Sequence, residues 1–214
     1  MKYLLFSHGF GVRKDSMGMF TDIAEAFPNY HSVMFDYNKI LDDGKKTIVP
    51  SYRQQAKILY SQIKSITQDD PMADITVIAH SQGCIVSGLV DTQAVSKVVL
   101  LAPPWSISHK RAKYRPNRKT LKTGAIKITK RNGDIIILSA RFVLALKRVN
   151  PIKIYQTLAS RALITTIIAK QDNIVNNDEF EISSSLNPIR INGDHNFTGH
   201  DREGLIAALS KVLS

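Results

Sequence analysis

The sequence predicts a single α/β domain, residues 1–214, in which about six parallel strands are flanked by helices. Short apolar runs of strand length alternate with longer amphipathic stretches, which is typical of a parallel sheet whose crossovers are helices. The chain of 214 residues is long enough to bury a substantial core. Its composition, 43% hydrophobic and 22% charged, excludes a disordered or fibrous protein.

The six expected strands are short apolar runs, each followed by a turn or a glycine. They lie at residues 3–7, 32–36, 75–79, 98–102, 164–169 and 188–191. The helices expected between them lie at residues 16–27, 52–66, 83–93 and 202–213. In the second of these helices, Leu59, Ile63 and Ile66 recur at the three-to-four spacing of a stripe that faces the core.

The regular alternation breaks at residues 103–159, which we interpret as an inserted lobe after the fourth strand. Two β-prone segments at 125–130 and 134–138 flank Asn132-Gly133, a turn signal that predicts a hairpin. The rest of the lobe is expected to form helices at 139–149 and 151–159.

Positive charge is concentrated in one part of the chain. The formal net charge is +11, and residues 92–133 hold eleven Lys and Arg and no Asp or Glu, so the remainder is formally neutral. Three interpretations stay open. The basic lobe binds an anionic substrate or membrane surface, it has affinity for nucleic acid without sequence specificity, or it is a solvated face. Nucleic acid is the partner that we expect least.

Cysteine content, hydropathy and the absence of known binding motifs limit the cellular location and the cofactors that we expect. Cys84 is the only cysteine, so the chain forms no internal disulfide and no cysteine-based zinc site, and its apolar neighbours indicate a packing role. No apolar run reaches the length of a membrane span, and the N-terminal run is too short for a signal peptide, so we expect a cytoplasmic protein. Without a P-loop, a G-x-G-x-x-G motif or a metal-ligand cluster, we expect no cofactor and no metal.

The clearest sign of chemistry lies at residues 75–83, where an apolar strand runs through Ala79-His80-Ser81-Gln82-Gly83 into an apolar helix. A nucleophilic serine in a tight strand-to-helix turn needs small residues two positions before and two positions after it, as Ala79 and Gly83 are. The turn also places Ser81 where the N–H groups of a helix start favour a developing negative charge. The alternative is that Ser81 is an ordinary helix N-cap.

This segment resembles the nucleophile elbow of the α/β-hydrolase family, with Ala79 in place of the first glycine of G-x-S-x-G. His8-Gly9-Phe10-Gly11, directly after the first strand, resembles the oxyanion loop of the same family. The resemblance implies that the backbone N–H groups of Phe10 and Gln82 form the oxyanion hole, and that His8 shapes the loop. The alternative is a plain glycine turn. The resemblance also implies the strand order 2-1-3-4-5-6 and a site at the carboxyl ends of the strands.

A serine nucleophile needs a base, and the base needs an orienting carboxylate. The family's chain order of serine, acid and histidine implies His195 as the base, since it follows the last expected strand, with His200 as the weaker candidate. It implies Asp172 as the acid, since this residue follows the strand before. Asp178 on the same loop and Asp194 beside the base are the rival acids, and Asp194 is expected to shape its turn or to face solvent.

Family members commonly carry an inserted cap over the active site, and the lobe at 103–159 occupies that place. Trp105 at its start either lines an acyl pocket or anchors the lobe on the core. The resemblance implies a serine hydrolase that cleaves a small-molecule carboxylic ester or thioester through an acyl-enzyme. If the basic lobe meets the substrate, its charge favours an anionic one such as an acyl-CoA or a phospholipid. The alternatives are a peptidase or amidase on the same triad, and a non-catalytic module whose basic lobe binds an anionic partner.

Overall fold

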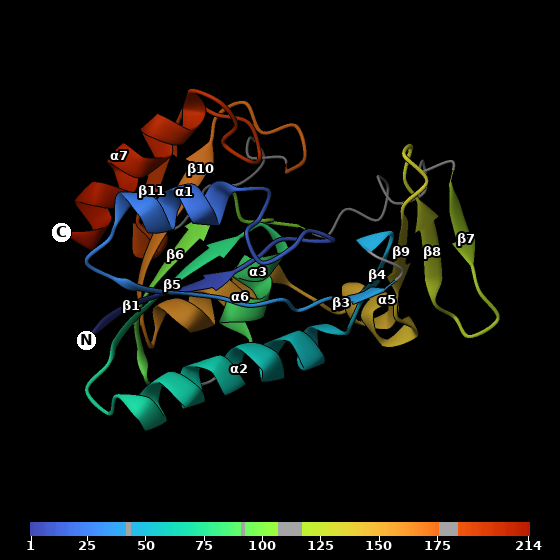
Figure 1. Ribbon diagram of the computed structural model, residues 1–214, viewed down its shortest axis with the longest axis horizontal. Coiled ribbons are helices and arrows are strands. Elements are labelled where there is room, and N and C mark those ends of the chain that lie inside the picture. The colour runs from blue at the N-terminus through green and yellow to red at the C-terminus, as the bar shows by residue number, and fades with distance from the viewer. Residues whose placement is uncertain (42–43, 91–92, 107–116, 176–183) are drawn as a thin grey trace.

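A six-stranded, fully parallel sheet forms the centre of the computed structural model (Figure 1). The structure describes residues 1–41, 44–90, 93–106, 117–175 and 184–214. The strands are β1 (Lys2–Ser7), β2 (His31–Met34), β5 (Asp74–His80), β6 (Val95–Leu101), β10 (Leu163–Ala169) and β11 (Pro188–Ile191). Their order across the sheet is β2-β1-β5-β6-β10-β11, which confirms the expected order.

Helices cover both faces of this sheet (Figure 1). One face carries α1 (Met19–Ala26) and α7 (Asp201–Leu213), and the other carries α2 (Tyr52–Asp69), α3 (Gln82–Gly88) and α6 (Pro151–Ala159). Alternate side chains of β1 serve the two cores, because Leu4 and Phe6 pack toward α1 and α7 while Tyr3 and Leu5 pack toward the other helices. Burial on both faces explains why the four central strands, β1, β5, β6 and β10, are mainly apolar, whereas the edge strands β2 and β11 are partly exposed and carry polar residues.

A second sheet of five strands lies at one end of the molecule, on the right in Figure 1. Its order is β3 (Lys39–Leu41), β4 (Lys46–Val49), β9 (Ile135–Leu138), β8 (Ile126–Thr129) and β7 (Arg118–Thr120). The hairpin β8–β9 turns at Gly133, whose φ of 87° is in the left-handed region that favours glycine. Strands β3 and β4 were not expected, and β4 joins the sheet by pairing in parallel with β9.

One face of the second sheet is buried in a core that it shares with the helices of the main body. Ile126, Ile128, Ile136 and Leu138 are buried in the same core as α2 and α3. Beyond β9, α5 (Ala140–Leu146) places Phe142 against Tyr52, with ring centroids 4.9 Å apart, and against Phe10 at 6.0 Å. Helix α6 instead packs on α3 and β10, so the segment 103–159 contributes to both parts of the structure.

Some boundaries differ from those expected. The first helix begins at Met19, because Ser16, Met17 and Gly18 are all left-handed, with φ values of 48°, 61° and 84°. A short 3₁₀ helix at Ser184–Leu186 precedes β11. Within the described part of the chain, no helix is long and apolar enough to cross a membrane. Both termini lie at the end opposite the second sheet (Figure 1).

Candidate active site

Ser81 occupies the sharp turn between β5 and α3. Its φ of 52° and ψ of −119° lie in a region that non-glycine residues rarely adopt, and such strain is typical of functional sites. The turn is possible because Gly83 has no side chain, since a Cβ there would lie 2.0 Å from the carbonyl oxygen of Ser7. Although Ser81 is at the N-cap position of α3, its hydroxyl makes no capping hydrogen bond, so it does not act as an ordinary N-cap.

Three of the expected site residues form one hydrogen-bonded chain at the carboxyl ends of the strands. Ser81 Oγ lies 2.8 Å from His195 Nε2, and His195 Nδ1 lies 2.7 Å from Asp172 Oδ2. The carboxylate can only accept, so Nδ1 carries the ring proton and Nε2 is free to accept from the Ser81 hydroxyl. The Asp172 side chain has no exposed surface, and that of His195 is 8% exposed.

The surroundings of Asp172 keep its carboxyl group ionised. Burial alone would raise its pKa, but the hydrogen bond from His195 and those from the N–H groups of Val175 and Ile174 outweigh burial and lower the pKa below its usual value. A carboxylate so held at the end of β10 presents Oδ2 to the imidazole in one orientation. The loop therefore fixes both the charge of Asp172 and its direction.

The alternative residues are placed elsewhere. Asp194 accepts from the N–H groups of Asn196 and Thr198 and from the Thr198 hydroxyl, so it holds the turn that carries His195. His200 is fully exposed at the start of α7 and lies 3.9 Å from Glu203. Asp178 lies outside the described residues, as does part of the basic segment, residues 107–116.

The two candidate oxyanion donors come from the ends of β1 and β5. Among the described residues, the backbone N–H groups of Phe10 and Gln82 donate to no other protein atom. The Gln82 side chain is turned away from Ser81, because its Nε2 donates to Gln55 Oε1 at 2.7 Å. His8 donates from Nδ1 to the Gly9 carbonyl and accepts the N–H of Tyr37 at Nε2, both at 2.9 Å, so it shapes the loop. Burial lowers the pKa of His8 and favours the neutral ring that this arrangement needs.

His80 is a buried part of the site that the sequence analysis did not single out. Its Nε2 donates to the backbone carbonyl of His195 at 2.9 Å, and its Nδ1 accepts from the Ser16 hydroxyl at 3.1 Å. Burial, and then the proximity of His195, lower the pKa of His80 to about 3. Its position next to Ser81 was the only sign of this role in the sequence, because its hydrogen-bond partners, Ser16 and His195, lie on loops that are distant along the chain.

Arg202 is a second residue that sequence reasoning missed. Arg202 lies on α7, and its Nε donates to the Phe197 carbonyl at 3.0 Å while its Nη2 donates to the Asn196 carbonyl at 3.3 Å. Its Nη1 pairs with the carboxylate of Asp22 on α1. The Arg202 side chain is 12% exposed. It therefore ties the loop after His195 to two helices.

Two other residues of the sequence analysis lie in the core. Trp105 is 3% exposed and packs edge-on against Tyr155, with ring centroids 5.7 Å apart, which favours the anchoring role; a contact with substrate stays a prediction. Cys84 is fully buried and donates to the Ala79 carbonyl, and burial raises the pKa of its thiol. No group of three or more possible metal ligands occurs in the part of the chain that the structure describes.

Comparison with known proteins gives similarity at the level of structure. No family model and no curated protein matches the sequence. Est1E from Butyrivibrio proteoclasticus, with ferulic acid bound, aligns over 100% of this chain and 88% of its own, with a TM-score of 0.70 and 12% identity. The alpha/beta hydrolase GrgF from Penicillium sp. sh18 aligns over 98% and 88%, with a TM-score of 0.67 and 15% identity. The esterase domain of a Rhodothermus marinus protein aligns over 98% and 85%, with a TM-score of 0.60 and 18% identity. The strand order, the helices on both faces and these similarities together assign the chain to the α/β-hydrolase fold.

Proposed function

We propose that the protein is a serine hydrolase that cleaves a carboxylic ester or thioester through an acyl-enzyme. The observation that carries this proposal is the unbroken chain of hydrogen bonds from Ser81 through His195 to Asp172, with distances of 2.8 Å and 2.7 Å. A serine hydroxyl is a weak nucleophile at neutral pH, and an adjacent neutral imidazole oriented by a carboxylate activates it.

In the first half of the reaction, Ser81 Oγ attacks the carbonyl carbon of the substrate while His195 Nε2 takes the hydroxyl proton. Asp172 balances the charge of the imidazolium that results. The N–H groups of Phe10 and Gln82 hold the oxyanion of the tetrahedral intermediate. Removal of one such donor typically raises the activation barrier by about 3–4 kcal/mol. As the intermediate collapses, His195 gives its proton to the departing alcohol or thiol, and the acyl group stays on Ser81.

In the second half, water takes the place of the alcohol. His195 removes a proton from the water, the hydroxide attacks the acyl carbon, and the same two N–H groups hold the second oxyanion. Collapse returns the proton from His195 to Ser81 Oγ and releases the carboxylic acid. Each step uses only the groups of the candidate site and one water molecule, so the proton and electron pairs balance without a metal or a cofactor.

Two considerations favour ester chemistry over binding alone. Structures with the same fold include Est1E with ferulic acid and an esterase domain. Their sequence identity to this chain is too low to indicate its substrate. A non-catalytic module has no need of a strained serine, a histidine and a buried carboxylate in hydrogen-bonded order. A peptidase or amidase would use the same groups, so the test must separate the leaving groups.

Labelling with a fluorophosphonate probe tests the nucleophile directly. We expect one covalent adduct, on Ser81, in wild-type protein and none in Ser81→Ala, as read by peptide mass spectrometry. A panel of aryl esters, thioesters and anilides of graded acyl length then ranks the leaving groups. An adduct on another serine would disprove the assignment, and hydrolysis of anilides in preference to esters would replace the esterase proposal by an amidase.

A further inference from the structure

The outer face of the second sheet combines lysines with isoleucines in register. Side chains alternate between the two faces of a strand, and the residues that face the core are Thr47 and Val49 on β4, Ile126 and Ile128 on β8, and Ile136 and Leu138 on β9. The residues between them therefore point outward. Strand pairing aligns five of these outward residues in one row across all five strands, in the order Lys39, Ile48, Ile137, Lys127 and Lys119.

A second row runs parallel to the first. It joins Leu41, Lys46, Ile135 and Thr129 across β3, β4, β9 and β8. We call the nine residues of the two rows the outer face. Its apolar members are half-buried, and its three isoleucines lie on β4 and β9, toward the middle of the sheet. Lys39 and Lys119 are exposed on the two edge strands, and Lys46 and Lys127 lie on β4 and β8.

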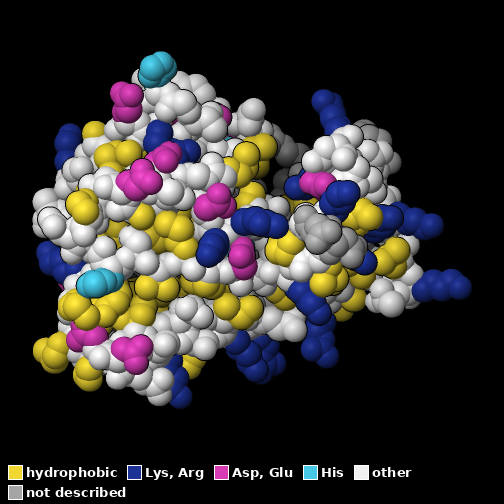
Figure 2. Space-filling model, in the orientation of Figure 1, with side chains coloured by type: hydrophobic (Ala, Val, Ile, Leu, Met, Phe, Trp, Pro, Cys, Tyr) yellow, Lys and Arg dark blue, Asp and Glu magenta, His cyan; other side chains and the backbone are white. Residues whose placement is uncertain are grey.

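The outer face is cationic and short of counter-charges. It has four lysines and no acidic residue, and none of the four makes an ion pair with a carboxylate among the described residues. Lys119 and Lys127 stand directly opposite each other on neighbouring strands, and like charges so placed are destabilising. Figure 2 shows Lys and Arg side chains projecting from the end of the molecule that holds this sheet. An anionic surface would relieve that repulsion.

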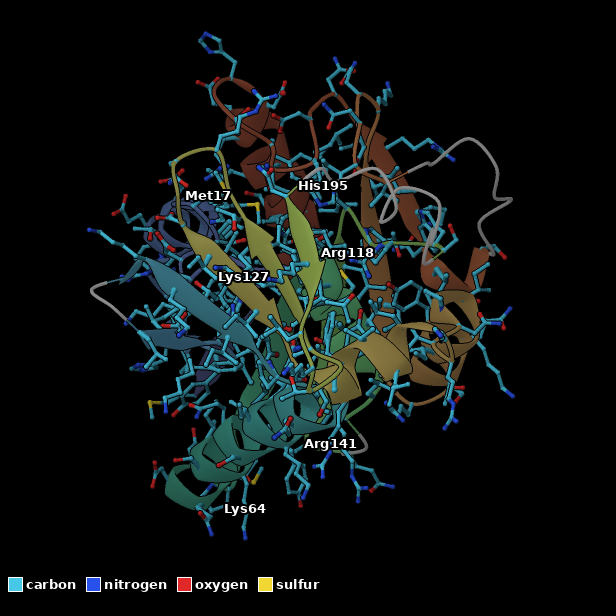
Figure 3. All side chains as sticks on the ribbon, turned by 90° about the vertical axis from the view of Figure 1, so that its right-hand side faces the viewer. Met17, Lys64, Arg118, Lys127, Arg141 and His195 are labelled. Atoms are coloured by element: carbon cyan, nitrogen blue, oxygen red, sulfur yellow. The ribbon has the colours of Figure 1, made fainter. Side chains whose placement is uncertain are left out.

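The outer face also points away from the candidate site. Figure 3 looks onto the second sheet from the end of the molecule, with Lys127 on the near side. The opposite face of the sheet meets the oxyanion loop, since a Cβ on Gly11 would lie 3.0 Å from Ile136 Cδ1. A partner on the outer face would therefore leave Ser81 uncovered.

The composition of the outer face separates the possible partners. Nucleic acid is held by phosphate contacts together with aromatic or arginine side chains that stack on bases, and this face has isoleucines at its centre and no aromatic residue. At a bilayer surface, lysines reach anionic head groups while apolar side chains enter the boundary with the acyl chains. We propose that the outer face is a peripheral docking surface for a membrane that contains anionic phospholipid.

Co-sedimentation with lipid vesicles tests the proposal. Wild-type protein should sediment with vesicles of phosphatidylcholine and phosphatidylserine, should not sediment with phosphatidylcholine alone, and should be released by added salt. The variant with Lys39, Lys46, Lys119 and Lys127 all changed to Gln should bind at least about a hundredfold more weakly, since each lysine near an anionic surface is worth about fivefold. The matched control changes the exposed Lys57, Lys64, Lys153 and Lys211 to Gln and should keep most of the binding.

A second variant separates lipid from other polyanions. Ile137→Thr keeps a β-branched residue in the strand and should weaken vesicle binding severalfold, because it removes an apolar group from the membrane boundary. Circular dichroism and thermal unfolding check the fold of every variant. Equal losses in the two quadruple variants, no binding to phosphatidylserine vesicles, or tighter binding to duplex DNA that Ile137→Thr leaves unchanged would each overturn the proposal. Sedimentation needs no hydrolysis, so its outcome is independent of the proposed esterase activity.

Discussion

The ring of His80 donates a hydrogen bond to the backbone carbonyl of His195 at 2.9 Å, and the two ring centroids lie 5.1 Å apart. A residue beside the candidate nucleophile thus supports the loop that carries the candidate base. His80 must stay neutral, because a charged ring there would be buried and would oppose the imidazolium that forms on His195 during the reaction.

The stability of the protein should therefore fall in mild acid. The pKa of His80 is about 3 in the folded protein and about 6.5 when unfolded, so between these values the unfolded chain binds a proton that the folded protein does not. The contribution of His80 to the free energy of unfolding is fully present above about pH 6.5. Below that pH it decreases by up to about 1.4 kcal/mol per pH unit as the pH falls toward 3. Urea unfolding of wild type and His80→Gln between about pH 4.5 and 6.5 measures the slope, which should be smaller in the variant. Equal slopes would contradict the assignment.

Removing the Ser81 hydroxyl should abolish ester hydrolysis and leave the fold intact. Ser81→Ala deletes one partly exposed oxygen and opens no core cavity, so the free energy of unfolding should change by less than about 1 kcal/mol. Steady-state kinetics and urea unfolding of the same preparation check both halves of this prediction. Residual activity near the wild-type level would show that another group attacks the substrate.

Replacement of the candidate base should lower kcat more than replacement of the candidate acid. His195→Ala should lower kcat by about 10⁶-fold, and Asp172→Asn by about 10⁴-fold, because the amide can no longer hold the imidazole in the required tautomer. His200→Ala is the control and should leave kcat within about twofold, since its side chain is fully exposed and its nearest charged partner is Glu203. An inactive His200→Ala with an active His195→Ala would reverse the assignment.

A side chain at Gly83 should not be tolerated. A Cβ at this position would lie 2.0 Å from the Ser7 carbonyl oxygen, which is closer than any real contact, so Gly83→Ala should abolish activity and unfold or severely destabilise the protein. Gly204→Ala, within α7, is the matched control. Apart from the neighbouring residues and the backbone of its own helix, no atom would lie within 4 Å of a Cβ at this position, so the change should be neutral or should stabilise by about 0.5–1 kcal/mol. Thermal unfolding of the two variants separates a local clash from a general intolerance of glycine replacement.

Arg202 should act by positioning the loop that follows His195. Arg202→Met removes the donors to the Asn196 and Phe197 carbonyls, so kcat should fall while KM changes little, and stability should fall by about 1–3 kcal/mol. Asp22→Asn removes only the charge of the half-exposed partner and should cost less than about 1 kcal/mol. Partial recovery of kcat in Arg202→Lys would support positioning; a rise in KM alone would contradict it.

The parallel sheet was accessible from the sequence because its strand signals are local, and Ser81, Asp172 and His195 were accessible because their segments resemble motifs of the α/β-hydrolase family that occur in the same chain order. The four central strands of that sheet are mainly apolar, Ser81 directly follows β5, and Asp172 and His195 lie three and four residues beyond the ends of β10 and β11. Strands β3 and β4 have three and four residues and pair with one another, but their place in a sheet depends on β9, about 90 residues further along the chain. No local pattern carries that information.

The supporting contacts of the site were inaccessible for a similar reason. His80 contacts Ser16 on one side and His195 on the other, and Arg202 contacts α1 as well as the loop after His195. The residue types alone fit many roles, and only the folded arrangement of three separate segments decides between them. The burial that makes the pKa of His80 low is likewise a property of the whole packing around it.

The pairing of β4 with β9 also determines which deletions the fold tolerates and how the chain folds during synthesis. The second sheet draws on two stretches of the chain, so deleting residues 103–159 would not remove a self-contained cassette. The deletion would leave β3 and β4 as a hairpin with a bare edge, and such edges invite aggregation. During synthesis the same edge stays open while about 90 residues emerge from the ribosome, and contacts over that sequence distance are slow to form. Engineers who wish to exchange this part of the protein must therefore replace both stretches together.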